Sequence, residues 1–338
     1  MFEGKPASLS QEDLFMIIEF LLSILVLCIT ATMCSLTSGG LIWELVDYAL
    51  LPGILLILAL MIFLSGYGNA FIMIFQTSNK NKGLAELKKT EASLDYAFKA
   101  LCFICSFFML ISGMYFYLNF DETNTLGINL ATLLLSFFYL SFFGMIFITL
   151  KAKLRTNIIK YMAEENTNAN AEIVVSGKKI AQNIVKIFVS LAFIIGLYLV
   201  TIHFSMANLT DSEPLSFYYL RDLPGIIYIF IPTLLLLIIS GNFKSFFGAL
   251  NFVIKNQKLS VTQKSISLNA ISTLRMLLIL EGIMTTLGGF IGMLFNLEDR
   301  SMLGINFSVA CVPMIYALLL NLILLPVESK VSLLCDSE

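Results

Sequence analysis

Long uninterrupted apolar runs are the feature of this sequence that most restricts its fold. A helix needs about 20 mostly apolar residues to cross a hydrocarbon core of roughly 30 Å. Because the runs are continuous rather than alternating, and a backbone in lipid must satisfy its own hydrogen bonds, they predict helices rather than a barrel. The expected spans are eight: 14–36, 48–76, 97–118, 126–150, 184–207, 223–253, 276–296 and 303–327.

The composition agrees with a membrane environment. Of 338 residues, 58% are hydrophobic and only 13% are charged, whereas soluble domains have about 45–50% apolar and roughly 25% charged residues. So little charge does not cover a soluble globule of this size, which argues against a cytoplasmic enzyme, a nucleic-acid binder or a disordered chain. We therefore predict an all-α integral membrane protein, in which the long segments 48–76 and 223–253 extend past the bilayer.

The positions of lysine and arginine predict the orientation. Of the 21 basic residues, only Arg221 and Arg300 fall in the connections that follow the odd-numbered spans. The others lie in the N-terminus, the tail and the segments around 77–99, 151–186 and 244–275. Since positive residues stay on the cytoplasmic side, both termini are expected in the cytoplasm, and the protein in the cytoplasmic (inner) membrane of a bacterium.

The chain also contains an internal repeat. The polar hairpin Asn119–Asn129 aligns with Asn296–Asn306 at an offset of 177 residues, with a shared Leu-Gly-Ile-Asn ending. Two further pairs keep this offset: Tyr139 with Tyr316, and Lys153 with Lys330. Similarity in a polar hairpin is not explained by the general likeness of Leu- and Phe-rich helices. Each half holds four predicted helices, an even number, so the halves are predicted to be parallel rather than inverted repeats.

Four segments follow from this duplication. Residues 1–153 form the first four-helix repeat and 184–330 the second, while 154–183, the largest hydrophilic stretch, is expected to be a cytoplasmic linker. Residues 331–338 are a tail.

The second half resembles the MotA/TolQ/ExbB proton-channel family. The resemblance lies in four stretches: Asp222-Leu-Pro-Gly225, Ile239-Ser-Gly241, Gly282 to Phe290, and Leu294 to Gly304 followed by Tyr316, Asn321 and Pro326. The first half matches more weakly, with Cys105, Met109 and Ser112 in place of Gly282, Thr286 and Gly289, and is predicted to be a degenerate copy. The large cytoplasmic insertion of the family is missing, and Pro313 and Met314 replace its paired threonines.

The resemblance implies a function and partners. Family members are channel subunits that assemble into rings around single-span proteins of the MotB/ExbD/TolR type, whose helix carries an essential aspartate, and couple proton or sodium flow to mechanical work in the envelope. A homo-oligomer with such a partner in the lipid bilayer is therefore expected here. It also implies an ion path through Thr286, Tyr316 and Pro326, and helix packing at Gly282, Gly289 and Asn321.

Few ionisable side chains fall inside the predicted spans. An ionisable group near mid-membrane costs about 2.5–3.5 kcal/mol on insertion scales and is a functional candidate by default. Glu281 is the strongest such candidate for the ion path, with pairing to Arg275 as a structural alternative. Glu19 is close enough to the headgroups to snorkel, and His203 is expected at the interface. Thr286 could hold water or relay an ion, or simply bond back to its own helix.

Other features favour packing rather than chemistry. Gly288 and Gly292 are spaced as a small-x-x-x-small pair that allows close helix approach. No catalytic constellation, metal-ligand cluster or phosphate-binding loop is present in the sequence, so we expect neither an enzyme nor a cofactor, and no nucleic-acid partner. Two alternatives stay open: a non-conducting membrane scaffold derived from the same family and, with less support, a small-molecule carrier.

Overall fold

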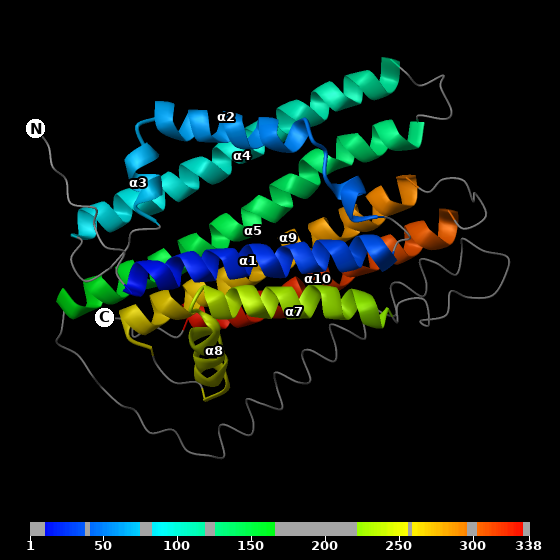
Figure 1. Ribbon diagram of the computed structural model, residues 1–338. Coiled ribbons are helices and arrows are strands. Elements are labelled where there is room, and N and C mark those ends of the chain that lie inside the picture. Colours follow the sequence, from blue (N-terminus) through cyan, green and yellow to red (C-terminus); the bar gives the residue numbers. More distant parts are fainter. Residues whose placement is uncertain are drawn as a thin grey trace, which may run out of the picture.

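The structure is a computed structural model, which describes residues 11–37, 41–74, 83–118, 126–165, 222–255, 259–295 and 303–333. This part of the chain is built almost entirely of helix, with no β-strand. The prediction of an all-α protein is therefore confirmed at this level. The helices, labelled as in Figure 1, are α1 (Gln11–Thr37), the 3-10 helix η1 (Ile42–Leu45), α2 (Leu50–Leu64), α3 (Gly68–Ile72), α4 (Leu84–Leu118), α5 (Leu126–Glu165), α7 (Leu223–Ile239), α8 (Phe243–Lys255), α9 (Val261–Phe295) and α10 (Leu303–Leu333).

Six helices of the described part are long and apolar enough to cross a membrane, and α7 with α8 would make a seventh if that bent pair is one span. These elements correspond to seven of the eight predicted spans. The remaining one, 184–207, lies outside the described residues, as do the predicted linker beyond Glu165 and His203. The chain is thus a multi-pass membrane protein by the length and composition of its helices.

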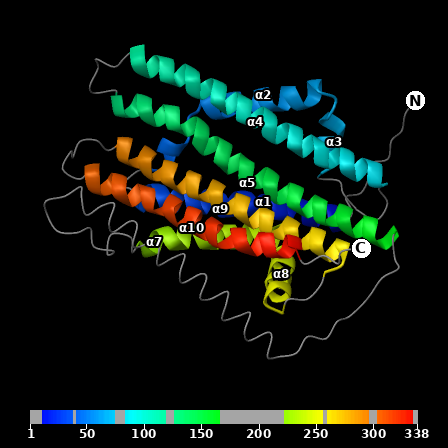
Figure 2. The same ribbon diagram turned by 180° about the vertical axis from the view of Figure 1, so that it is seen from behind.

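The long helices lie side by side in one layer, in the order α4, α5, α9 and α10 (Figures 1 and 2). α2 packs on the outer side of α4, while α1 and α7 pack together against α9. α5 and α9 come from different halves of the chain and are among the most closely associated pairs. The two halves therefore share one helical layer rather than forming separate bundles.

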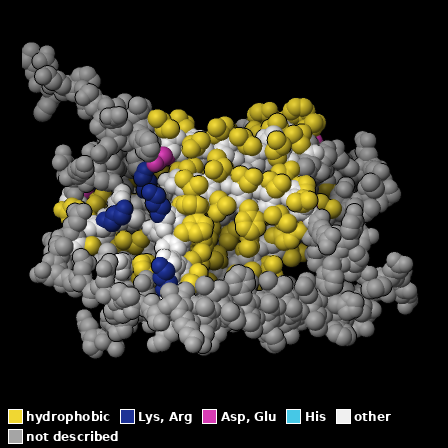
Figure 3. Space-filling view, turned by 90° about the horizontal axis from the view of Figure 1, so that it is seen from below, with side chains coloured by type: hydrophobic (Ala, Val, Ile, Leu, Met, Phe, Trp, Pro, Cys, Tyr) yellow, Lys and Arg dark blue, Asp and Glu magenta, His cyan; other side chains and the backbone are white. Residues whose placement is uncertain are grey.

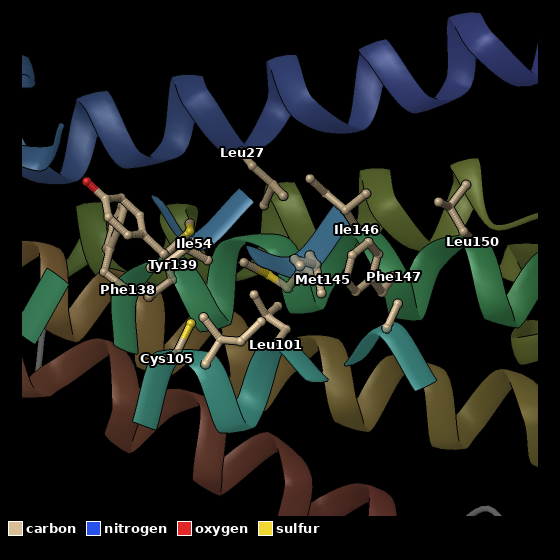
Figure 4. Packing of buried hydrophobic residues seen from close by; sticks show 14 of the residues in the cluster. Leu27, Ile54, Leu101, Cys105, Phe138, Tyr139, Met145, Ile146, Phe147 and Leu150 are labelled. Carbon is tan, nitrogen blue, oxygen red and sulfur yellow. The ribbon is translucent and has the colours of Figure 1, made fainter. Parts of the chain in front are cut away.

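The buried core follows this arrangement. One apolar cluster joins α1, α2, α4, α5 and α9, and a second joins α7, α8, α9 and α10. Figure 4 shows part of the first cluster, where Leu27 of α1, Leu101 of α4 and Met145 of α5 lie close together.

Large apolar side chains also cover the outside of the molecule: Leu64 is 82% exposed and Phe103 is 78% exposed. Figure 3 shows this broad hydrophobic surface, with lysine and arginine side chains gathered on one side of it. An apolar exterior of this kind suits contact with lipid.

Both long predicted segments are broken by a glycine. The prediction of a continuous helix over 48–76 is wrong, because α2 ends at Leu64 and the short α3 follows. Likewise 223–253 is divided into α7 and α8, whose axes differ by 103°. The breaks coincide with Gly66 (φ 78°) and Gly241 (φ 72°), a backbone conformation that glycine adopts without the steric cost of a Cβ.

Candidate functional site

Glu281 is the most unusual residue of the described structure. It lies in the second half of α9, its side chain is fully buried, and neither carboxyl oxygen has a hydrogen-bond partner among the described residues. An unpaired carboxylate in an apolar interior costs several kcal/mol, and a proton or a bound cation removes most of that cost. A carboxyl group in this position is therefore suited to holding and releasing an ion.

Arg275 does not pair with Glu281. Six residues turn the helix by about 600°, which leaves the two side chains about 120° apart around α9. Arg275 instead forms an ion pair with Glu328 of α10, and its Nε donates to Oδ1 of Asn321 at 3.2 Å. The amide of Asn321 in turn donates to the Arg275 carbonyl oxygen at 3.2 Å and to that of Ala317 at 3.1 Å. Asn321, for which a role in helix packing was expected, thus joins α9 to α10.

Thr286 lies five residues beyond Glu281, which places it about 140° away around α9, and its neighbour Thr285 behaves differently. The hydroxyl of Thr285 donates to the carbonyl oxygen of Glu281 at 2.7 Å, the back-bond expected of a membrane threonine. The hydroxyl of Thr286 is buried and has no partner within the described ranges. Thr286 is therefore free to bond a water molecule or an ion, as Glu281 is.

Two more buried hydroxyls, which the sequence analysis did not single out, share this property. Thr233 of α7 and Ser136 of α5 are buried without a hydrogen-bond partner in the part of the chain that the structure describes. Thr233 follows Pro232 in the apolar run of α7, and a polar residue beside an in-helix proline was the signal available in the sequence.

The glycines of α9 bring two neighbouring helices close. A Cβ at Gly282 would lie 2.6 Å from the Cβ of Ala317 in α10, so only hydrogen fits there. On another face, Gly288 lies next to Cys34 of α1, whose thiol donates to the carbonyl oxygen of Thr285 at 3.0 Å. Gly289 and Gly292 are buried in the same helix. This part of α9 is thus flanked by α10 from the second half of the chain and by α1 from the first.

Tyr316 and Pro326 are not brought together. The Tyr316 hydroxyl accepts a hydrogen bond from the backbone N–H of Asp222 at the start of α7, at 3.1 Å. Pro326 lies ten residues further along α10, about 15 Å away by helical rise, and is exposed. The four residues predicted for an ion path therefore do not form a single cluster, and only Glu281 and Thr286 are near neighbours in the chain.

A second polar group joins the halves near their charged ends. The Thr156 hydroxyl of α5 lies 2.7 Å from Oδ1 of Asn242, in the turn between α7 and α8. Asn269 of α9 donates to the Thr156 hydroxyl and to the Ala152 carbonyl oxygen, both at 3.1 Å. All three polar side chains are buried. Sequence reasoning missed this group because its members come from three distant segments.

Glu19 is paired rather than free. It forms an ion pair with Lys153 of α5, and both side chains are about one-fifth exposed. The described residues contain no group of three or more histidine, cysteine or acidic side chains that could together hold a metal ion. The candidate site therefore consists of Glu281 and Thr286, the residues of α9 with buried, unpartnered polar atoms in the described structure, which lie on different faces of that helix.

Fold and site together define a class: a multi-pass, all-helical membrane protein with a buried acidic residue inside one of its long apolar helices. Comparisons with protein-family models, with curated proteins and with solved structures give no match for this chain.

Proposed function

We propose that this protein is a channel-type membrane subunit, similar to MotA/TolQ/ExbB proteins, that assembles with a single-span partner and couples proton or sodium flow to mechanical work in the envelope. The single observation that supports it best is the fully buried Glu281, whose carboxyl oxygens have no partner in the described structure. An ionisable side chain inside the membrane destabilises the fold, and it is a functional candidate because binding an ion offsets that cost. Thr286, five residues further along α9 and on another face of that helix, has a buried, unpartnered hydroxyl that can also bond an ion.

A tandem arrangement of two parallel four-helix repeats, with eight spans, is part of the proposal. α4 and α9 both contain 35 residues, and each begins and ends 177 residues from its counterpart. α5 and α10 begin with the same offset, at Leu126 and Leu303. The positive-φ glycines Gly66 and Gly241 interrupt the preceding helices in both halves. These correspondences support repeats at 1–153 and 184–330.

We place the lysine- and arginine-rich end of the helices in the cytoplasm of a bacterial cell, with both termini on that side. In the described structure these residues lie toward the start of α4 and α9, the end of α5 and α10, and in α8. Reporter fusions at residue 338 and within the 119–125 connection test the orientation. Opposite locations, with residue 338 inside, are expected, and the same location for both would refute the topology.

The ion path is tested by purifying the native complex and reconstituting it in vesicles. We expect Glu281→Gln to reduce ion flux by about a hundredfold or more, because a positioned proton-transfer group contributes about 10²–10⁴-fold to a rate. Glu86→Gln, at an exposed acid near the start of α4, is the control and should conduct normally. If Glu281→Gln assembles and conducts like the parent, Glu281 has no part in the path.

A non-conducting scaffold is the second candidate function. The contact between α9 and α10 is closed at Gly282, where Ala317 occupies the space that a side chain would need. Pro313 and Met314 also stand where the family has paired threonines. A scaffold should show no ion flux above that of empty vesicles, and its assembly with partners should survive Glu281→Gln and Thr286→Val unchanged.

A further inference from the structure

A cleft lies where α4, α5 and α9 meet, away from Glu281. α5 forms its floor, and it is lined by residues 94–98 of α4, 147–155 of α5 and 269–276 of α9. It is found in the half of the helices that carries the lysine and arginine residues. The cleft draws on both halves of the chain and contains none of the residues of the candidate ion path.

The lining is polar at one end and apolar at the other. Toward the charged ends of the helices lie Asp95, Lys151, Arg155, Asn269 and Ser272. Toward the middle of the helices lie Phe98, Phe147, Ile148 and Met276. All three helices show the same gradient, although α5 runs opposite to α4 and α9. A ligand that fits this cleft has a polar head and an apolar body, aligned with the helices.

The polar end can accept a phosphate. Lys151 is bound to Asp95, with Nζ 2.5 Å from Oδ1, and these two charges offset each other. Arg155 follows one turn later on α5, is exposed, and forms no ion pair within the described ranges. A guanidinium group binds phosphate oxygens through two parallel hydrogen bonds. The exposed hydroxyl of Ser272, across the cleft, adds a further donor.

The apolar end can accept acyl chains. Met276 is 51% exposed and Phe98 and Ile148 are partly exposed, so lipid tails can lie against them. Methionine is flexible and adapts to irregular apolar shapes. Basic pockets between membrane helices at the cytoplasmic face are typical binding places for anionic lipid headgroups.

We propose that this cleft binds the phosphate headgroup of an anionic phospholipid, with Arg155 on the phosphate and the acyl chains along Phe98 and Met276. The site joins α4 and α5 to α9, so the bound lipid stabilises the contact between the two halves. The proposal is independent of ion conduction. It needs only the multi-span membrane fold and the cleft.

The test is native mass spectrometry of the purified, delipidated full chain after addition of phosphatidylglycerol, phosphatidylethanolamine or inorganic phosphate. The parent protein should retain phosphatidylglycerol over phosphatidylethanolamine, and Arg155→Gln should reduce that retention by about fivefold, as expected for one basic group at a lipid headgroup. Lys160→Gln, at an exposed lysine of the same helix outside the cleft, should bind like the parent.

A second variant tests the apolar end. Met276→Trp fills the cleft at an exposed position and should also reduce lipid retention, whereas Leu325→Trp, at a 43% exposed position of α10, should not. Equal retention by all variants would overturn the proposal. Equal retention of the two lipids would overturn the preference for an anionic headgroup. Retention of inorganic phosphate alone, lost in Arg155→Gln, would mean that the cleft serves a free anion and not a lipid.

Discussion

Tyr139 and Tyr316 make the same hydrogen bond in the two halves of the chain. The Tyr139 hydroxyl accepts the backbone N–H of Asp47 at 2.8 Å, and the Tyr316 hydroxyl accepts that of Asp222 at 3.1 Å. Each tyrosine thereby ties the segment that leads into α2 or α7 to the long helix α5 or α10. Tyr139 also donates to the carbonyl oxygen of Leu45 at 3.0 Å. Because N–H groups at helix starts lack intrahelical partners, these phenols satisfy groups that would otherwise be costly in a membrane.

Tyr139→Phe should therefore destabilise the protein. The change leaves the Leu45 carbonyl oxygen and the Asp47 N–H without this partner, at a cost of about 1–3 kcal/mol. Thermal unfolding in detergent should show a lower midpoint for Tyr139→Phe and also a lower one for Tyr316→Phe. Tyr48→Phe, at an 81% exposed side chain beside Asp47, is the control and should unfold like the parent. An unchanged midpoint for Tyr139→Phe would contradict the role of its hydroxyl.

Gly282→Ala should separate α9 from α10. The new Cβ would lie 2.6 Å from the Ala317 Cβ and 3.2 Å from the Met314 sulfur, and Ala317 is fully buried. Overpacking of this kind costs about 1–3 kcal/mol. Gly53→Ala is the matched control, because its Cβ would meet only the Phe108 ring at 3.9 Å. We expect Gly282→Ala to lower the unfolding midpoint while Gly53→Ala keeps or raises it, and equal midpoints would show that the helices can yield.

Gly241→Ala should strain the turn between α7 and α8. A Cβ there would meet nothing within 4 Å, so the whole effect comes from the φ of 72°. A non-glycine residue in this conformation costs roughly 1–2 kcal/mol.

Asparagine tolerates the left-handed region better than alanine does, so Gly241→Asn should lie between Gly241→Ala and the parent in an unfolding experiment. Gly248→Ala, within α8 and with only Phe252 at 3.9 Å, controls for the loss of a glycine. If Gly241→Asn were less stable than Gly241→Ala, side-chain size and not backbone strain would be responsible.

The ion pair of Arg275 and Glu328 is suited to a charge exchange. Both side chains are about one-quarter exposed, and the pair holds α9 to α10 next to Asn321. Glu328→Gln should lower the free energy of unfolding by about 1–3 kcal/mol, the range for losing a charged hydrogen bond. Arg275→Glu alone should cost more, because it places two acids together.

The double variant Arg275→Glu with Glu328→Arg should recover part of this loss, measured as a coupling energy in a double-mutant cycle. Recovery is expected to be partial, since Asn321 loses the Arg275 donor. Additive losses in the double variant would show that the pair contributes nothing to stability.

The sequence was sufficient to predict where most helices lie. Continuous apolar runs of adequate length can satisfy the backbone in lipid only as helices, and α1, α2, α4, α5, α9 and α10 all match predicted spans. The two breaks were missed because apolar residues continue on either side of Gly66 and Gly241, so hydropathy does not register a change of direction that depends on backbone φ.

The candidate site was predictable only in part. Glu281 stands out in a sequence because an acid in an apolar run is rare, and Thr286 follows from the family pattern. The sequence could not show that Arg275 binds Glu328, that Asn269 meets Thr156, or that Thr233 and Ser136 are buried without described partners. These facts depend on how the helices are rotated, and lipid-facing and protein-facing residues are equally apolar.

The sequence by itself therefore determined the helical class, the membrane environment and a short set of ionisable residues, because each follows from local hydropathy and charge. Only the tertiary structure decided that α5 and α9 pair across the two halves, which buried polar groups find a hydrogen-bond partner, and that α4, α5 and α9 line a cleft that is polar at one end and apolar at the other. The physical reason is that membrane helices associate through close packing and individual hydrogen bonds rather than through an amphipathic stripe that the sequence displays.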